Sequence, residues 1–373
     1  MRRINLNKAL SILVLFFLVF FTTQTIQASE GEKEKFNAGE LIIDHIIDSH
    51  EWHIITVGEK HISIPLPIII IDGGKITSFM SSRFEHGHAT YKGYALPAEG
   101  DHKGKIVKVQ EDGSVDENAK IFDFSITKNT FSLFISIFII SILFIQISKR
   151  YQRNPVSSPK GIQSLIEPII VFVIDDIAKS SIGPKYQRYL PFLLTLFFFI
   201  LINNLMGLVP FFPGGANVTG NITVCAVLAL FTFFVITFTG NKNYWAHMFN
   251  TPGVPWWLKV PLPLMPIIEV LGAITKPFVL MVRLFANITA GHIIALGFVC
   301  LIIIFGEISA AAAYGISVIS VLLSVFIGML EILVAFIQAY VFTLLSALYF
   351  GMAVEEHHKE HELAPEAVKA ITE

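Results

Sequence analysis

Arg283, Asn287 and His292 stand inside an otherwise apolar run of this 373-residue chain. A charged side chain at membrane depth costs about 2.5–3.5 kcal/mol on insertion scales, so an arginine there indicates a function. At about 100° per residue, Arg283 and Asn287 share one helical face with Ala290 and Gly291. The two small residues allow another helix to approach this face closely. Asn287 lies one turn from Arg283 and can orient its guanidinium.

A second apolar run carries Glu331 and Gln338, which are seven residues apart and also share a helical face. A carboxylate within the membrane needs a partner, and His292 is the candidate. An acid and a histidine in a water-filled crevice can relay protons, because histidine titrates near neutral pH and a buried carboxylate titrates closer to that range than an exposed one. If the two helices pack antiparallel, we expect Gln338 to approach Arg283.

A purely structural role is the competing interpretation, because a buried Arg, Glu and His can simply fix the helix register. Glu269 and Lys276 either extend the polar stripe or reach toward the membrane surface with their charged ends. Asn204, next to Asn203, is more typical of an interhelical hydrogen bond than of a ligand. Two matched polar stripes on two very long helices favour an ion pathway.

The composition is that of a membrane protein. Hydrophobic residues make up 53% of the chain and charged residues 15%, and several windows of about 20 apolar residues occur. We therefore predict an all-α polytopic membrane protein with about five membrane-embedded helical spans. The net charge of −2 argues against a nucleic-acid partner. Cys225 and Cys300 lie in apolar runs and are interpreted as small core residues, and neither a cofactor nor a metal is predicted.

The predicted spans differ greatly in length. Three are expected at 130–147, 189–209 and 221–238, with an amphipathic stretch at 162–177 along the membrane surface. The last two, 263–304 and 313–354, would each be roughly 60 Å long as helices, about twice the thickness of the hydrocarbon core. Each must be strongly tilted, broken or partly outside the bilayer. Natural bend points are Pro277, Gly291 and Gly297, and Glu307 marks the turn between the two segments.

The N-terminal third differs in kind from the rest. Residues 1–28 resemble a signal peptide, with a basic start, a short apolar core and a small residue at Ala28. An uncleaved membrane anchor is the alternative. Residues 29–125 are polar, and short alternating runs broken by Asp-Gly turns predict a small β-rich extramembrane domain.

Charge asymmetry predicts the orientation. Lysines and arginines are frequent from Lys149 to Arg188, which is typical of a cytoplasmic segment. We therefore expect residues 29–125 to be periplasmic, residues 126–354 to form the membrane domain, and the polar tail 355–373 to be cytoplasmic.

The outer domain is rich in histidine, with His45, His50, His53, His61, His86, His88 and His102. His86 and His88 alternate, so both rings can face one side of a strand and bind a metal. Solvated surface histidines are the favoured alternative, because no further metal-ligand spacing accompanies the pair. The residues predict no function for this domain.

Several motifs together resemble those of subunit a of the F-type ATP synthase. The most specific is Arg283-Leu-Phe-Ala-Asn287, preceded by Lys276-Pro277 and followed by Ala290-Gly291. Others follow in the expected order: Asn204-Leu-Met-Gly-Leu-Val-Pro210, Asn221-Ile-Thr223, Glu331 with Gln338, and Glu355-Glu-His357. The resemblance covers roughly residues 130–357 and leaves out the outer domain.

This resemblance implies a non-catalytic stator subunit of the bacterial inner membrane. It would pass protons through two half-channels to and from the carboxylates of a rotating c-ring, so that proton flow drives rotation and ATP synthesis. Subunit b of the stator stalk and the rest of the ATP synthase are the further implied partners. Because residues of the ring mainly select the ion, sodium is the alternative to the proton.

The resemblance also implies residue roles. Arg283 would face the passing ring carboxylate, with Gln338 close by and with Asn287 and Gly291 lining the same region. His292 and Glu331 would belong to the outside half-channel. Some similar members carry an acid at the first of these two positions and a histidine at the second, and this chain has the reverse order.

Two other classes of protein compete with this interpretation. One is a secondary transporter of a small anion, with Arg283 as the counter-ion. Such carriers are commonly built from repeats, and no internal repeat is visible in the sequence. The other is a membrane scaffold whose outer domain binds a partner.

Overall fold

The computed structural model describes residues 36–57, 60–87, 89–97, 100, 102–110, 114–153, 158–209, 212–249 and 264–354. The chain divides into two units, residues 1–37 and 38–373. Only Phe36 and Asn37 of the first unit are described. The predicted signal peptide at 1–28 and the predicted tail at 355–373 lie outside the described residues.

Five helical segments in the described part of the chain are long and apolar enough to cross a membrane, which confirms the predicted fold class. They are α3 (Lys128–Arg153), the composite segment Ile162–Leu208, α7 (Ile222–Thr239), α9 (Leu264–Ile308) and α10 (Ala310–Val354). In the most apolar window of α9 and of α10, only 11% of the residues are buried within the chain. Most of these apolar side chains therefore face lipid or another subunit.

The composite segment is a helical hairpin. It consists of α4 (Ile162–Phe172), the π-helical η2 (Val173–Lys179), α5 (Ser180–Ile182), the 3₁₀ turn η3 (Gly183–Lys185) and α6 (Tyr186–Leu208). The expected amphipathic character is present, because Val173 and Ile177 are buried while Asp175 and Asp176 are exposed. The buried side packs against α6 and α10. Its position along a membrane surface remains a prediction.

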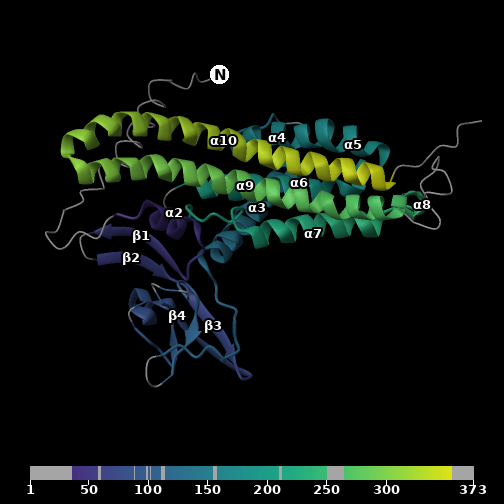
Figure 1. Ribbon diagram of the computed structural model, residues 1–373. Helices are drawn as coiled ribbons and strands as arrows, with labels where there is room; N and C mark the ends of the chain where they lie inside the picture. Colours follow the sequence, from purple (N-terminus) through teal and green to yellow (C-terminus); the bar gives the residue numbers. More distant parts are fainter. Residues whose placement is uncertain are drawn as a thin grey trace, which may run out of the picture. The chain divides into compact units, whose positions relative to one another are not determined.

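Helices α9 and α10 form a long antiparallel hairpin and lie side by side (Figure 1). Each has 45 residues and is roughly 70 Å long. The turn is at Ser309, whose Oγ accepts a hydrogen bond from the Ala312 N–H at 3.1 Å, close to the predicted turn at Glu307. Helix α9 continues without a break through the predicted bend points Pro277, Gly291 and Gly297. Tilt or protrusion from the bilayer must therefore accommodate its length.

The main hydrophobic core lies where α6, α7, α10 and η2 meet. Phe197 and Phe350 are fully buried, and Tyr189 stacks on Phe350 with 4.8 Å between ring centroids. Gly351 allows α10 to approach α5, because a Cβ there would collide with the Ser181 carbonyl oxygen. Close packing of this kind fixes the register of α10 against the hairpin.

The N-terminal domain is rich in β-strands, as predicted. Its elements are α2 (Ala38–Ile46), β1 (Glu51–Val57), β2 (Lys60–Pro65), β3 (Pro67–Asp72), β4 (Lys75–Met80), η1 (Ser81–Gly87), β5 (Tyr94–Ala95), β6 (Val107–Lys108) and β7 (Ile121–Asp123). The strands pair antiparallel in three small sheets, β1-β2, β4-β3-β7 and β5-β6. Ile68, Ile70 and Phe84 form its core, because alternate residues of β3 point to the same side.

Two parts of this domain contact the helices. Trp52 of β1 is 3% exposed and clusters with Ala216 and Val218 of the loop between α6 and α7. Its ring also meets Phe131 and Phe212 edge-on, at centroid distances of 6.0 and 5.3 Å. The helix α2 packs against α9. At the other end of the hairpin, α8 (Lys242–Phe249) also contacts α9.

Candidate functional site

Arg283 lies near the middle of α9 with an exposed side chain. Within the described residues it makes no hydrogen bond or ion pair. Asn287 and Ala290 are exposed as well, while Leu280 and Leu284 on the other side are buried at 2% and 0%. The predicted face with Arg283 and small or polar residues is therefore present, and it points away from the core of this chain.

Gln338 of α10 is buried, at 4% exposure, behind this face. The antiparallel packing on which the expected approach of Gln338 to Arg283 depended is present. Gly291 lies against Glu331, and Lys276 lies over Tyr349. Arg283 falls between these two levels, within about one turn of the level of Gln338. No hydrogen bond joins Arg283 to Gln338 among the described residues.

Asn204 fixes α6 to α10 one turn before Gln338. Its Nδ2 donates to the Ala335 carbonyl at 3.3 Å, and its Oδ1 accepts from Thr219 Oγ1 at 2.6 Å. This is the interhelical hydrogen bond expected for Asn204. Asn203 behaves differently, because its Nδ2 donates to the Phe199 carbonyl of its own helix at 2.8 Å.

Glu331 and His292 lie in one region between α6, α9 and α10. A Cβ placed at Gly291 would lie 2.5 Å from Glu331 Oε1, so only glycine lets the carboxylate rest against α9. A Cβ placed at Gly207 of α6 would lie 3.8 Å from His292 Nε2. Glu331 therefore packs against the residue next to His292, and no hydrogen bond or ion pair joins the two predicted partners in the described chain. His292 Nε2 is buried and has no hydrogen-bond partner among the described residues.

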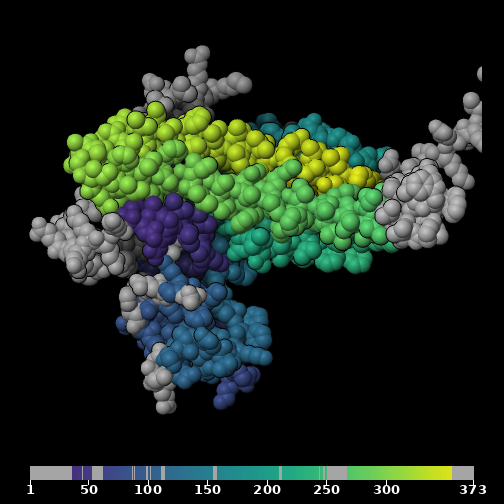
Figure 2. Space-filling view, viewed as in Figure 1, coloured from purple at the N-terminus to yellow at the C-terminus, as the bar shows by residue number. Residues whose placement is uncertain are grey.

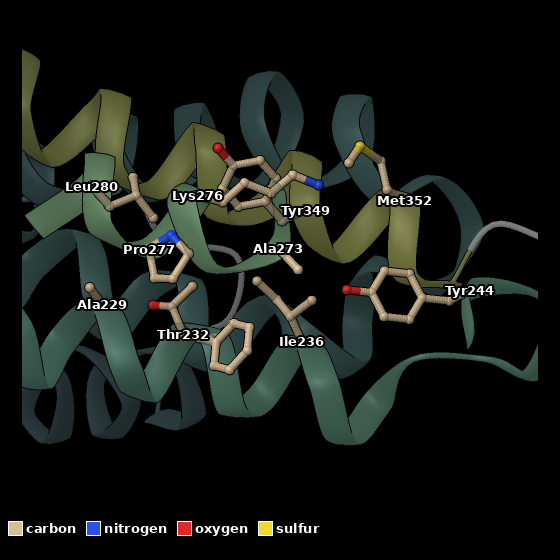
Figure 3. A pocket seen from close by; sticks show the side chains of 11 residues that line it. Ala229, Thr232, Ile236, Tyr244, Ala273, Lys276, Pro277, Leu280, Tyr349 and Met352 are labelled. Carbon is tan, nitrogen blue, oxygen red and sulfur yellow. The ribbon is translucent and has the colours of Figure 1, made fainter. Parts of the chain in front are cut away.

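Lys276 belongs to a small pocket at the opposite end of α9 (Figure 3). Its Nζ is 5.1 Å from the centroid of the Tyr349 ring, within the range of a cation–π contact, and the charge of Glu269 also acts on it. The pocket's space for water centres is about 20 Å³, which is room for about one or two water molecules. The lining residues are Ala229, Thr232, Phe233, Ile236, Tyr244, Ala273, Lys276, Pro277, Leu280, Tyr349 and Met352.

Sequence reasoning missed the aromatic members of this pocket. Tyr244 and Tyr349 stand in apolar segments, where an aromatic residue is normally part of the core. Their position beside Lys276 depends on how α8 and α10 pack on α9. Lys276 therefore has a partner inside the protein and does more than reach toward a membrane surface.

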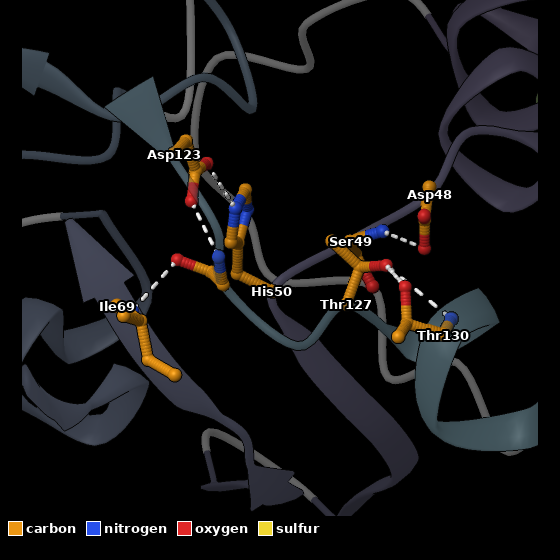
Figure 4. Close-up of polar contacts among 8 residues, drawn as sticks. Asp48, Ser49, His50, Ile69, Asp123, Thr127 and Thr130 are labelled. Carbon is orange, nitrogen blue, oxygen red and sulfur yellow. Dashed lines mark hydrogen bonds and ion pairs between the residues drawn. The ribbon is translucent and has the colours of Figure 1, made fainter. Parts of the chain in front are cut away.

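Not every histidine of the outer domain is a solvated surface residue. His50 is 8% exposed, and its Nε2 lies 3.1 Å from Asp123 Oδ2 (Figure 4), so for this residue the surface interpretation is wrong. Partial burial acts to raise the pKa of Asp123, but hydrogen bonds from His50 and Ser125 hold it below the usual range. The side chains of His86 and His88 lie outside the described part, so the metal alternative there stays a prediction.

Five apolar helical segments, with an exposed arginine and a partly buried acid and histidine on the last two, are those of a polytopic membrane protein. Residues 130–351 match the family described as ATP synthase A chain. The chain belongs to this family of subunit a, the non-catalytic proton-channel stator subunit of F-type ATP synthases. Of the competing classes, the family assignment disfavours both the anion transporter and the scaffold.

Individual relatives share more than the membrane part. The chain is 36% identical over 343 residues to ATP synthase subunit a of Chlorobium phaeobacteroides, with 90% of this chain and 80% of that protein covered. It is 42% identical over 343 residues to ATP synthase subunit a 2 of Prosthecochloris aestuarii, covering 90% and 86%. With subunit a of Chloroherpeton thalassium it shares 44% over 254 residues, covering 65% and 72%.

The outer domain has its own match. Residues 41–124 match a family described as a domain of unknown function, DUF8433. Because the first two alignments span 90% of this chain, they include most of this domain. The resemblance inferred from the sequence motifs covered roughly residues 130–357. These alignments extend the similarity to subunit a toward the N-terminus.

Proposed function

We propose that this chain passes protons between two half-channels and the carboxylates of a rotating ring of c subunits, with Arg283 as the fixed charge that each carboxylate meets. The observation that carries this proposal is the exposed Arg283 without a partner in the described chain. Arginine does not deprotonate in proteins, so it keeps its charge even at membrane depth. A lone charge there is costly, and a carboxylate on another subunit would balance it.

The surroundings of Arg283 support a sliding contact. Asn287 and Ala290 are exposed on the same face, and small residues permit close helix approach. The positive charge of Arg283 favours the ionised form of a carboxylate that comes near. Each ring carboxylate would release its proton on arrival and take up another after it has passed.

Two polar regions flank Arg283 along α9. His292 with Glu331 lies nine residues, or roughly 13 Å, toward one end. Lys276 with its pocket lies seven residues, or roughly 10 Å, toward the other end. This separation supports two offset half-channels, with His292 and Glu331 in the outer one and Lys276 and Glu269 near the inner one. Arg283 between them would prevent a direct leak.

Charge supports the orientation. Helix α3 ends in Lys149, Arg150 and Arg153, and such residues gather on the cytoplasmic side. The domain at 29–125 would then be periplasmic after removal of the signal at 1–28, and the C-terminal tail cytoplasmic. The implied partners are the c-ring and subunit b of the stator stalk in a bacterial inner membrane.

The test is Arg283→Ala in the assembled ATP synthase in proteoliposomes. We expect proton-driven ATP synthesis to be lost, because the passing carboxylate no longer meets a fixed charge, and passive proton leak to increase. Arg283→Lys should support little more proton-driven ATP synthesis than Arg283→Ala, since lysine loses its charge on burial. Co-purification with a small carboxylate-bearing ring subunit shows that the complex assembled.

The matched control is Arg153→Ala, which removes an exposed arginine at the end of α3 and should leave synthesis unchanged. Coupled ATP synthesis by assembled Arg283→Ala enzyme would overturn the proposal.

A further inference from the structure

The contact between α2 and α9 brings the domain of unknown function next to His292. Helix α2 packs against α9, and Figure 2 shows the purple N-terminal region against the green hairpin. His45 lies in the last turn of α2, and Lys128 is the first residue of α3. The charges of both residues act on His292. Two groups from outside the hairpin therefore face the proposed outer path.

Hydrogen bonds connect the segment after α2 to the start of α3, and Figure 4 shows one of them, from Ser49 to Asp48. Asp48 Oδ1 accepts from the backbone N–H groups of Ser49 and Asn129, both at 3.0 Å. The Lys128 N–H donates to the Ser49 carbonyl at 2.8 Å. The end of α2 is thereby tied to the start of α3, so His45 and Lys128 keep a fixed relation to each other and to α9.

His292 needs a partner that the described chain does not supply. A buried ring nitrogen without a hydrogen bond is destabilising, and Nε2 of His292 is in this state. Water or a transferred proton can satisfy it. The charges of His45 from α2 and Lys128 from α3 act on His292, Glu331 from α10 lies against the adjacent Gly291, and α7 contains no charged residue.

The environment of His45 suits a group that binds a proton briefly. His45 is an exposed residue, and the proposal requires that outside water reaches its ring. The surrounding protein and, to a smaller extent, the charge of Lys128 lower the pKa of His45. A proton bound there is therefore released readily, which a relay requires.

Resting on the function proposed above, we propose that His45 is the outermost proton-binding residue of the outer half-channel, so that the domain of unknown function forms its mouth. The His45 imidazolium releases its proton through water, and neutral His292 accepts a proton at Nε2. His292 passes a proton on to the Glu331 carboxylate, which releases it toward the ring carboxylate of the proposed function, and hydronium from the outside reprotonates His45. Only N–H and O–H bonds form and break, and no other reactant is consumed. Lys128 is a positioning residue that acts through the histidines.

The test uses the whole ATP synthase in proteoliposomes, with His45→Ala and the matched control His102→Ala from the same domain. We expect His45→Ala to reduce proton flux about tenfold, with normal ATP hydrolysis by the detached catalytic part, and added imidazole to restore flux partly. His102→Ala should behave like the wild type. Wild-type flux in assembled His45→Ala enzyme would overturn the inference.

A second variant keeps the inference testable if His45→Ala does not assemble. The two native cysteines, Cys225 and Cys300, are buried and free, so a cysteine introduced by His45→Cys is the accessible target for a cationic thiosulfonate reagent. Labelling it should block proton flux, whereas labelling after His102→Cys should not. Full flux after complete labelling at position 45 contradicts the inference.

The two proposals fail in different ways. If Arg283→Ala abolishes coupling while His45→Ala leaves flux unchanged, only the role of His45 is wrong. If Arg283→Ala retains coupling, the function proposed for the hairpin is itself wrong.

Discussion

The α9–α10 hairpin and the β-rich domain differ in whether their charged side chains have partners within the chain. In the β-rich domain two carboxylates have partners: Asp72 Oδ2 lies 2.6 Å from Lys108 Nζ, and Asp123 pairs with His50. The hydrogen bond from Lys108 lowers the pKa of Asp72. In the hairpin, Arg283 is exposed on an apolar helix and has no ion-pair partner among the described residues.

The difference follows from the solvent of each region. In water an unpaired charge costs little, and an exposed ion pair contributes about 0–1 kcal/mol. At membrane depth an unpaired charge is expensive, so its presence indicates a function and a partner on another chain. Substitutions in the hairpin should therefore change proton flux with little effect on stability, and substitutions in the β-rich domain's ion pairs should do the reverse.

The loss of Arg283 should have the largest effect on proton flux. Removing either member of the acid–histidine pair should have the next largest. Glu331→Gln and His292→Ala each take away a proton-binding group, and we expect proton flux to fall by about 10²-fold. The exchange variant, with His292→Glu and Glu331→His together, should recover part of the flux because it keeps one acid and one histidine. Fluorescence quenching in proteoliposomes measures the rate. Unchanged flux in the single variants removes the pair from the path.

Gly291→Ala should give a smaller loss. Its Cβ would lie 2.5 Å from Glu331 Oε1, so the flexible carboxylate must move while the helix itself stays intact. We expect flux to fall about tenfold, because displacing a reacting group by about 1 Å is costly. Gly297→Ala is the matched control, since nothing lies within 4 Å of a Cβ there. Equal flux in the two variants would show that the position of the Glu331 carboxylate does not matter.

Lowering the pH should give the smallest effect, a loss of stability confined to the β-rich domain. The folded-state pKa of Asp123 is lowered, so its contribution to stability is present above the unfolded value near 4 and is lost as the pH falls through the folded value. Because Asp123 is partly exposed, we expect about 1 kcal/mol or less. Hydrogen exchange of the backbone amides around His50 and Asp123, corrected for the intrinsic pH dependence, measures this in the whole enzyme. In Asp123→Asn the pH-dependent part should disappear, and an unchanged profile would contradict the prediction.

Much of the fold was predictable because it follows from local pattern. Long apolar runs specify membrane helices regardless of what they pack against, so the bounds of α7 and α10 differ from the prediction by only a few residues. The continuity of α9 through Pro277 was not predictable. A proline removes one helical hydrogen bond, and whether the helix then breaks depends on packing around it.

The candidate site was predictable only in part. The face with Arg283 and Asn287 follows from helical spacing alone. Helix α2 carried no strong signal, because its nine residues are short for a helix that forms by itself. The burial of His50 against Asp123 joins residues far apart in the chain, and no local pattern marks such a pair.

The amino-acid sequence alone specifies the membrane class of this protein, its family motifs and the placement of a permanent charge on an apolar helix. These properties depend on residue type and on spacing within one turn or two. Tertiary packing was needed to show that Glu331 lies against Gly291, that Asn204 bonds to α10 near Gln338, and that α2 packs against α9. Such contacts join distant segments, and they depend on how the whole set of helices packs and on which register that packing selects.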